Sequence, residues 1–376
     1  MNEKEVAELR RRFRPDRNSI SHVRGCYVNE QGEIISQFDQ SLGMMTQDEN
    51  ERFLAILRKT LSGSIGRNLL DIEFDTNQVV HGAEHKLLMT LRSSALHDEE
   101  AVQTFFQKVI SSVHLESNYL ILLTRDAYDV PFRSKDGEQL EDASNDVFTY
   151  ILCTICPVKS TKPALSYHVQ ENAFHTLSPD WVVSQPEFGF IFPAFDERST
   201  NIYNALYYTR DLTQNQSDFI DVLFRSHAPM PAATQKETFQ EMLCEVLEDD
   251  CSFDVVQDIH GKMREMLELH KASKDPTPLT MPKLAVKRML EDCGVSDAGI
   301  EKFNEHYDSS FGEDTELLPK NLVDSRQLEL KTPDVIIRVN PERSDLIRTE
   351  MINGCRYIMI RADDGVEVNG IQIEIS

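Results

Sequence analysis

The sequence lacks any hydrophobic run long enough to cross a membrane. Its longest apolar stretches, Tyr119 to Leu123 and Tyr150 to Cys156, fall far short of the roughly 20 residues that a spanning helix requires. No apolar segment follows the charged first residues, so we expect no secretory signal. We therefore expect a soluble cytoplasmic protein with no membrane partner.

Cysteine is also sparse, with seven residues in a chain of 376. This odd, scattered set excludes a dense disulfide scaffold and indicates free thiols in a reducing compartment. Cys153 and Cys156 form the one C-x-x-C pair. On a strand their odd separation places them on opposite faces, which favours buried structural cysteines over a chelating or redox pair.

The common catalytic motifs are missing. We find no P-loop and no G-x-S-x-G nucleophile elbow, and no cofactor is predicted. One H-x-x-E-H match remains, formed by His81, Glu84 and His85. On a helix these residues could hold zinc and activate water, which gives a metal-dependent hydrolase as the alternative function. Gly82 inside the motif favours a plainer interpretation, the polar start of a helix.

Charge is unevenly distributed. The chain carries a net charge of −24, yet residues 1–25 sum to +3 and the remainder to −27. Guanidinium groups make bidentate contacts with phosphate or carboxylate, so this end could bind an anionic partner or could dock onto the acidic body. Both interpretations remain open. The arginines concerned are Arg10, Arg11, Arg12, Arg14, Arg17 and Arg24.

The residue patterns predict a mixed α+β protein with several modules. A helix is expected over residues 1–14, a hairpin over 25–35, and helix starts at the capping boxes of Thr46 and Thr234. A polar loop is expected over 133–145, and Asn-Gly turns predict two C-terminal hairpins. The expected modules are an N-terminal α+β part at 1–115, a central mixed sheet at 116–230, a helical segment at 231–270, a linker at 271–282, and short helices with β-hairpins at 283–376.

Several segments of the sequence are similar to the sequences of one bacterial family. They include the arginine-rich segment 9–16, the hairpin segment 24–29, the aromatic segment 198–208 and the segment 334–343. In these segments and in its acidic C-terminal end, the chain resembles the family catalogued as domain of unknown function 4317. The resemblance implies a bacterial cytoplasmic protein and supplies no reaction, cofactor or catalytic residue.

The combined features favour a non-enzymatic binding or regulatory protein, although they do not decide whether it is an enzyme. The expected partner of the arginine-rich end is nucleic acid, a nucleoprotein or another protein. A loose analogy of element order with acidic nucleoid-associated proteins slightly favours this class, but fold does not fix function.

Overall fold

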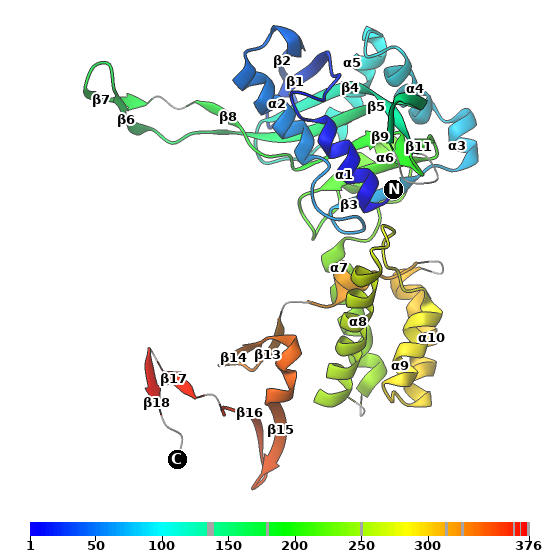
Figure 1. The fold of residues 1–376 in the computed structure, drawn as a ribbon, viewed down its shortest axis with the longest axis vertical. Helices are drawn as coiled ribbons and strands as arrows, with labels where there is room; N and C mark the ends of the chain where they lie inside the picture. Colours follow the sequence, from blue (N-terminus) through cyan, green and yellow to red (C-terminus); the bar gives the residue numbers. More distant parts are fainter. Residues whose placement is uncertain are drawn as a thin grey trace. The chain divides into compact units, whose positions relative to one another are not determined.

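The computed structural model describes residues 1–133, 139–177, 180–248, 251–312, 315–324, 327–363, 365–368 and 370–373. The chain divides into two compact units (Figure 1). Unit 1 comprises Met1–Thr234 and Pro276–Pro278, and unit 2 comprises Gln235–Asp275 and Leu279–Ser376.

Unit 1 is built around one large antiparallel sheet. Its strands lie in the order β2-β1-β4-β5-β9-β12-β3, and β8 pairs with the end of β5. Because β1 and β3 precede residue 115 and β5 and β9 follow it, residues 1–115 and 116–230 contribute to the same sheet. The strands are β1 (His22–Val28), β2 (Ile34–Ser41), β3 (Leu69–Glu73), β4 (Tyr119–Arg133), β5 (Gln139–Ser160), β8 (Trp181–Val183), β9 (Phe188–Phe192) and β12 (Asn204–Thr209).

Helices cover both faces of this sheet. Successive side chains of a strand point to opposite faces, so Leu122 packs toward α1 and α2 while Ile121 packs toward α4, α5 and α6. The two resulting cores make unit 1 a three-layer structure. The helices are α1 (Glu3–Arg12), α2 (Gln47–Lys59), α3 (Thr76–His81), α4 (Ala83–Ser93), α5 (Glu99–Ser112) and α6 (Ser217–Phe224), with a 3-10 turn η1 (Leu42–Met44).

A β-hairpin extends away from the sheet (Figure 1). It is formed by β6 (Ala164–His168) and β7 (Ala173–Leu177), and β8 follows at its base. Tyr167 and Phe174 pair across it with ring centroids 5.2 Å apart, and Phe174 remains 69% exposed. A second small hairpin joins β10 (Ala194–Asp196) to β11 (Ser199–Asn201).

Unit 2 combines a helical core with terminal hairpins. Phe239, Met263, Leu290 and Phe303 are buried among its helices. The helices are α7 (Ala232–Leu247), α8 (Phe253–Ser273), α9 (Lys283–Asp292), α10 (Asp297–Phe311) and α11 (Pro319–Leu322). The hairpins pair β13 (Leu328–Lys331) with β14 (Ile336–Val339), β15 (Ile347–Ile352) with β16 (Cys355–Ile360), and β17 (Val366–Val368) with β18 (Ile371–Ile373), and η3 (Pro341–Leu346) precedes β15.

The predicted mixed α+β class is confirmed, and the pairings of the central sheet between described residues are antiparallel. Two local predictions need correction. Helix α7 already begins at Ala232, so Thr234 lies inside the helix and does not cap it. The loop expected at 133–145 is too long, because β4 extends to Arg133 and β5 begins at Gln139. Of that loop, residues 134–138 lie outside the described part of the chain.

Candidate anion-binding surface

The helix that carries the arginines has charges separated along its axis. Asn2 caps α1 by accepting from the backbone N–H groups of Lys4 and Glu5, and Glu5 returns a capping-box contact. Acidic residues occupy the first turn of the helix and arginines the last, which matches the helix dipole at both ends. The buried side chains of Val6 and Leu9 hold α1 against the sheet.

The acidic residues of α1 are engaged in internal contacts. Glu3 accepts from the backbone N–H of Ile65 at 3.0 Å, and Glu5 accepts from that of Arg198 at 3.2 Å. Glu8 pairs with the Arg198 guanidinium and accepts a hydrogen bond from the Tyr128 hydroxyl. These carboxylates therefore stabilise the docked helix.

Three of the six predicted arginines are used to hold the N-terminal segment in place. The Arg10 guanidinium donates to the carbonyls of Leu61 and Gly63, the latter at 2.7 Å. These carbonyls follow the end of α2, where the helix dipole favours a cation. Arg24 lies on β1 and donates to Glu99 at 2.6 Å and to the Leu96 carbonyl at 3.0 Å.

Arg12 is held by a buried carboxylate of the sheet. Its Nε lies 3.5 Å from Asp126 Oδ2, and Asp126 is only 1% exposed. Ser19 Oγ donates to Oδ1 of the same carboxylate at 2.7 Å, and the Tyr150 hydroxyl donates to Oδ2 at 2.8 Å. Burial, followed by the charge of Asp126, raises the pKa of Tyr150 well above its usual value, so the phenol remains a donor.

The other three arginines, Arg11, Arg14 and Arg17, are exposed. The backbone N–H of Arg17 donates to the Arg14 carbonyl at 3.0 Å, so these two residues share one tight turn after α1. Arg17 lies 3.7 Å from Asp16 in an exposed pair, which contributes little. Among the described residues, Arg11 and Arg14 have no ion-pair partner.

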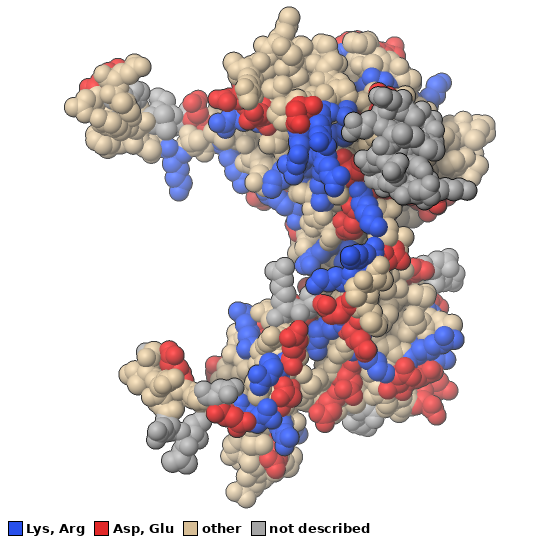
Figure 2. All heavy atoms as spheres, in the orientation of Figure 1, with Lys and Arg blue, Asp and Glu red and all other residues tan. Residues whose placement is uncertain are grey.

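Helix α2 adds a cation beside this segment. Burial lowers the pKa of Arg10, Glu3 partly opposes that change, and the nearby Arg58 lowers the pKa further by repulsion. Figure 2 shows Lys and Arg side chains gathered over α1. We call Arg11, Arg14, Arg17 and Arg58 the basic face.

The H-x-x-E-H residues do not lie on one continuous helix. His81 ends α3, Gly82 has extended backbone angles, and α4 begins at Ala83. His85 is buried and its Nε2 lies 2.9 Å from the Ile202 carbonyl. Glu84 pairs instead with Lys108, at 3.3 Å. Over the part of the chain that is described, no three His, Cys, Asp or Glu side chains are grouped to hold a metal.

The anchors Asp126, Tyr150 and Ser19 were not identified from the sequence. Asp126 and Tyr150 lie far from α1 along the chain and meet through the sheet register, whereas Ser19 lies seven residues after Arg12. One signal was present: Asp126 follows the apolar run of β4, where a carboxylate needs a partner if it is buried. The C-x-x-C pair behaves as expected for structural cysteines, since both thiols are buried and burial raises the pKa of Cys156 to about 12.

These features define an α+β protein that presents a fixed cationic surface at its N-terminal helix. The chain belongs to the family described as domain of unknown function DUF4317, whose profile matches residues 1–371. The resemblance inferred from the residues is thereby confirmed. No curated protein matches the chain significantly. No helix among the described residues is long and apolar enough to span a membrane.

Proposed function

We propose that the protein is a non-enzymatic binding protein that contacts the phosphate groups of nucleic acid through its basic face. The proposal depends on one observation above all. Within one short segment, Arg10 and Arg12 are bound internally, whereas Arg11, Arg14 and Arg17 point to solvent. The internal contacts of Arg10 and Arg12 therefore fix the backbone that carries the three exposed arginines.

Two physical arguments support a phosphate partner. Arginine forks match phosphate oxygens, and cations that neutralise phosphates release condensed counterions. The carboxylates of α1, which would otherwise compete for the exposed arginines, are engaged by Ile65, Arg198 and Tyr128. Because the segment is already docked, its backbone also loses little freedom on binding.

A cytoplasmic location belongs to the same proposal. It is supported by seven free cysteines, four of which are buried in the folded units. A bacterial source remains the implication of the family resemblance.

The test is binding to a labelled duplex DNA and a labelled single-stranded RNA at low salt, measured by fluorescence anisotropy. The variant R11A/R14A/R17A removes the exposed arginines and leaves the internal contacts of Arg10, Arg12 and Arg24 intact. We expect at least a tenfold loss of affinity, since each phosphate contact adds to the electrostatic free energy of binding.

A matched control removes three exposed cations elsewhere. Lys86 lies on α4, across the sheet from α1, and Lys159 and Lys162 lie toward the β6–β7 hairpin. K86A/K159A/K162A has the same net charge as the arginine variant, so we expect it to bind nearly as the wild type does. If both variants lose the same affinity, the loss is due to net charge alone, and the basic face is rejected as the binding site. If the wild type binds neither the DNA probe nor the RNA probe, the nucleic-acid proposal is rejected, and a protein is then the expected partner.

A further inference from the structure

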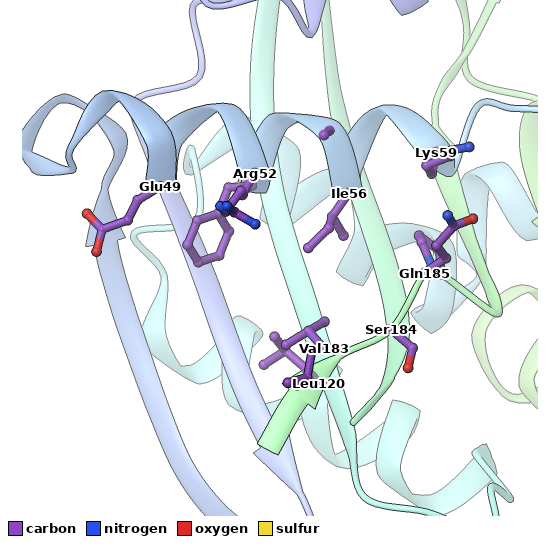
Figure 3. Close-up of a pocket in the computed structure, with 12 residues that line it drawn as sticks. Glu49, Arg52, Ile56, Lys59, Leu120, Val183, Ser184 and Gln185 are labelled. Atoms are coloured by element: carbon purple, nitrogen blue, oxygen red, sulfur yellow. The ribbon is translucent and has the colours of Figure 1, made fainter. Parts of the chain in front are cut away.

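A groove separates α2 from β8 and the residues that follow it (Figure 3). Its volume is about 500 Å³, which lies within the usual range for small-molecule sites. Leu120 of β4, which is 7% exposed, contributes to its apolar lining, as do Ile56 of α2 and Val183 of β8. The groove therefore offers an apolar surface on the same side of the sheet as α1 and α2.

The polar groups of the groove are placed asymmetrically. Figure 3 shows Lys59, Ser184 and Gln185 at one end, while Ile56, Val183 and Leu120 occupy the middle. Among the described residues, the Lys59 ammonium has no ion-pair partner. This end therefore combines an unpaired cation with a hydroxyl and an amide, all of which can donate hydrogen bonds.

The opposite end of the groove carries one acidic and one basic residue, Glu49 and Arg52. The Glu49 carboxylate already accepts internal hydrogen bonds. Glu49 accepts from the Thr46 backbone N–H at 2.9 Å and from the Thr46 hydroxyl at 2.8 Å. These contacts lower the pKa of Glu49 and fix its carboxylate at the start of α2. Arg52 lies one turn further along, so the rim of the groove carries one more cation than anion.

The spacing along α2 sets the scale of the site. Arg52, Ile56 and Lys59 follow one another at intervals of four and three residues, which places them along one face of the helix. Seven residues of helix separate Arg52 from Lys59, or about 10 Å. An apolar strip of about this length lies between the polar end at Lys59 and the charged end at Glu49 and Arg52.

We propose that this groove binds a single-chain amphiphile with a carboxylate head. The carboxylate accepts hydrogen bonds from Lys59, Ser184 and Gln185, and the alkyl chain lies along Ile56, Val183 and Leu120. A neutral lipid would leave Lys59 without a counterion, and a cationic amphiphile would be repelled by it. A small hydrophilic anion would leave the apolar strip exposed to water.

The chain provides its own reporter for this site. Its single tryptophan, Trp181, is 60% exposed and directly precedes Val182, which lines the groove. An alkyl chain seated beside β8 therefore changes the tryptophan fluorescence in a saturable way. This readout responds to ligand at the groove and does not depend on nucleic-acid binding.

The experiment titrates the full chain with dodecanoate below its micellar concentration, using calorimetry and Trp181 fluorescence together. We expect one site per chain. K59Q removes the cation at the polar end and should weaken binding about two- to fivefold, the effect of losing an exposed ion pair. K86Q removes an exposed cation on the other side of the sheet and should leave binding unchanged.

Two further ligands test the contributions of the charged head group and of the alkyl chain separately. Dodecyltrimethylammonium has the same chain with the opposite charge, and acetate has the head alone; we expect neither to bind at the concentrations used. The proposal is overturned if dodecanoate fails to bind the wild type, if the cationic amphiphile binds equally well, or if K59Q and K86Q behave alike. None of these outcomes affects the basic face, whose test uses other arginines and other ligands.

Discussion

At the scale of single residues, the arrangement of the arginine-rich end depends on where carboxylates and carbonyls are buried. Arg11 and Arg12 are neighbours in sequence, yet Arg12 reaches Asp126 inside the protein while Arg11 remains exposed. The sequence pattern identifies the arginines as a group and leaves open whether they dock onto the acidic body or bind an anionic partner. The pattern does not divide the arginines into docked and exposed ones, because Asp126 lies more than a hundred residues away and reaches Arg12 only through the register of β4.

Replacing Asp126 by Asn should destabilise unit 1. The change removes the anion that faces Arg12 and leaves a guanidinium that is only 18% exposed without its charge partner. We expect a loss of about 3 kcal/mol in the free energy of unfolding, measured by urea denaturation. R11Q, at the neighbouring exposed position, should stay within about 0.5 kcal/mol of the wild type. Equal stability of D126N and the wild type would show that this carboxylate does not anchor the segment.

His260 should make unit 2 sensitive to mild acid. Burial, followed by the nearby cations Arg264 and Lys236, lowers the pKa of this residue to about 4. The unfolded chain, with an ordinary pKa near 6.5, binds a proton that the folded state does not bind between these two values. The free energy of unfolding should therefore fall by about 2–3 kcal/mol as the pH drops from about 6.5 to about 4.

The variant H260Q isolates this effect. Its stability, followed by thermal unfolding across the same pH range, should lack that part of the decline. If wild type and H260Q lose stability in parallel, the histidine is not the group responsible.

At the scale of elements, the prediction succeeded where local chemistry determines the outcome. The capping box at Thr46 starts α2, and the Asn353-Gly354 turn joins β15 to β16. It failed where an element is set by its partners. The N-terminal half of β5 is polar, and its strand character comes from pairing with β4. The groove beside α2 could not be predicted from the sequence either, because it forms only when β8 lies opposite the helix.

The β1–β2 hairpin has a packing detail that can be tested by substitution. Gly25 pairs with Phe38, and a Cβ atom at Gly25 would lie 2.0 Å from the phenyl ring that covers it. G25A should therefore cost about 1–3 kcal/mol through overpacking, measured by urea denaturation.

Two further variants serve as controls for that substitution. G25A/F38A should recover part of the loss, since the ring that causes the clash is absent. Gly261 in α8 has no heavy atom within 4 Å of an added Cβ, so G261A should instead stabilise by about 0.5–1 kcal/mol. A fully stable G25A would mean that Phe38 does not cover the glycine in solution.

At the scale of the whole molecule, the chain is strongly acidic and carries a small cationic surface. Composition and charge showed this asymmetry directly, and the resemblance of several segments was sufficient to identify the family. They could not show that one sheet unites strands from both sides of residue 115, because strand order follows from long-range pairing. The proposed function places a local phosphate contact on an otherwise anionic protein, which predicts binding that weakens steeply with salt.

The most direct test of this account is the slope of log affinity against log salt concentration for duplex DNA. If Arg11, Arg14 and Arg17 each neutralise a phosphate, the wild-type slope should be steeper than that of R11A/R14A/R17A by roughly 3, close to one for each arginine. K86A/K159A/K162A should keep the wild-type slope. Identical slopes for the wild type and the arginine variant would contradict the central claim that the basic face contacts phosphate.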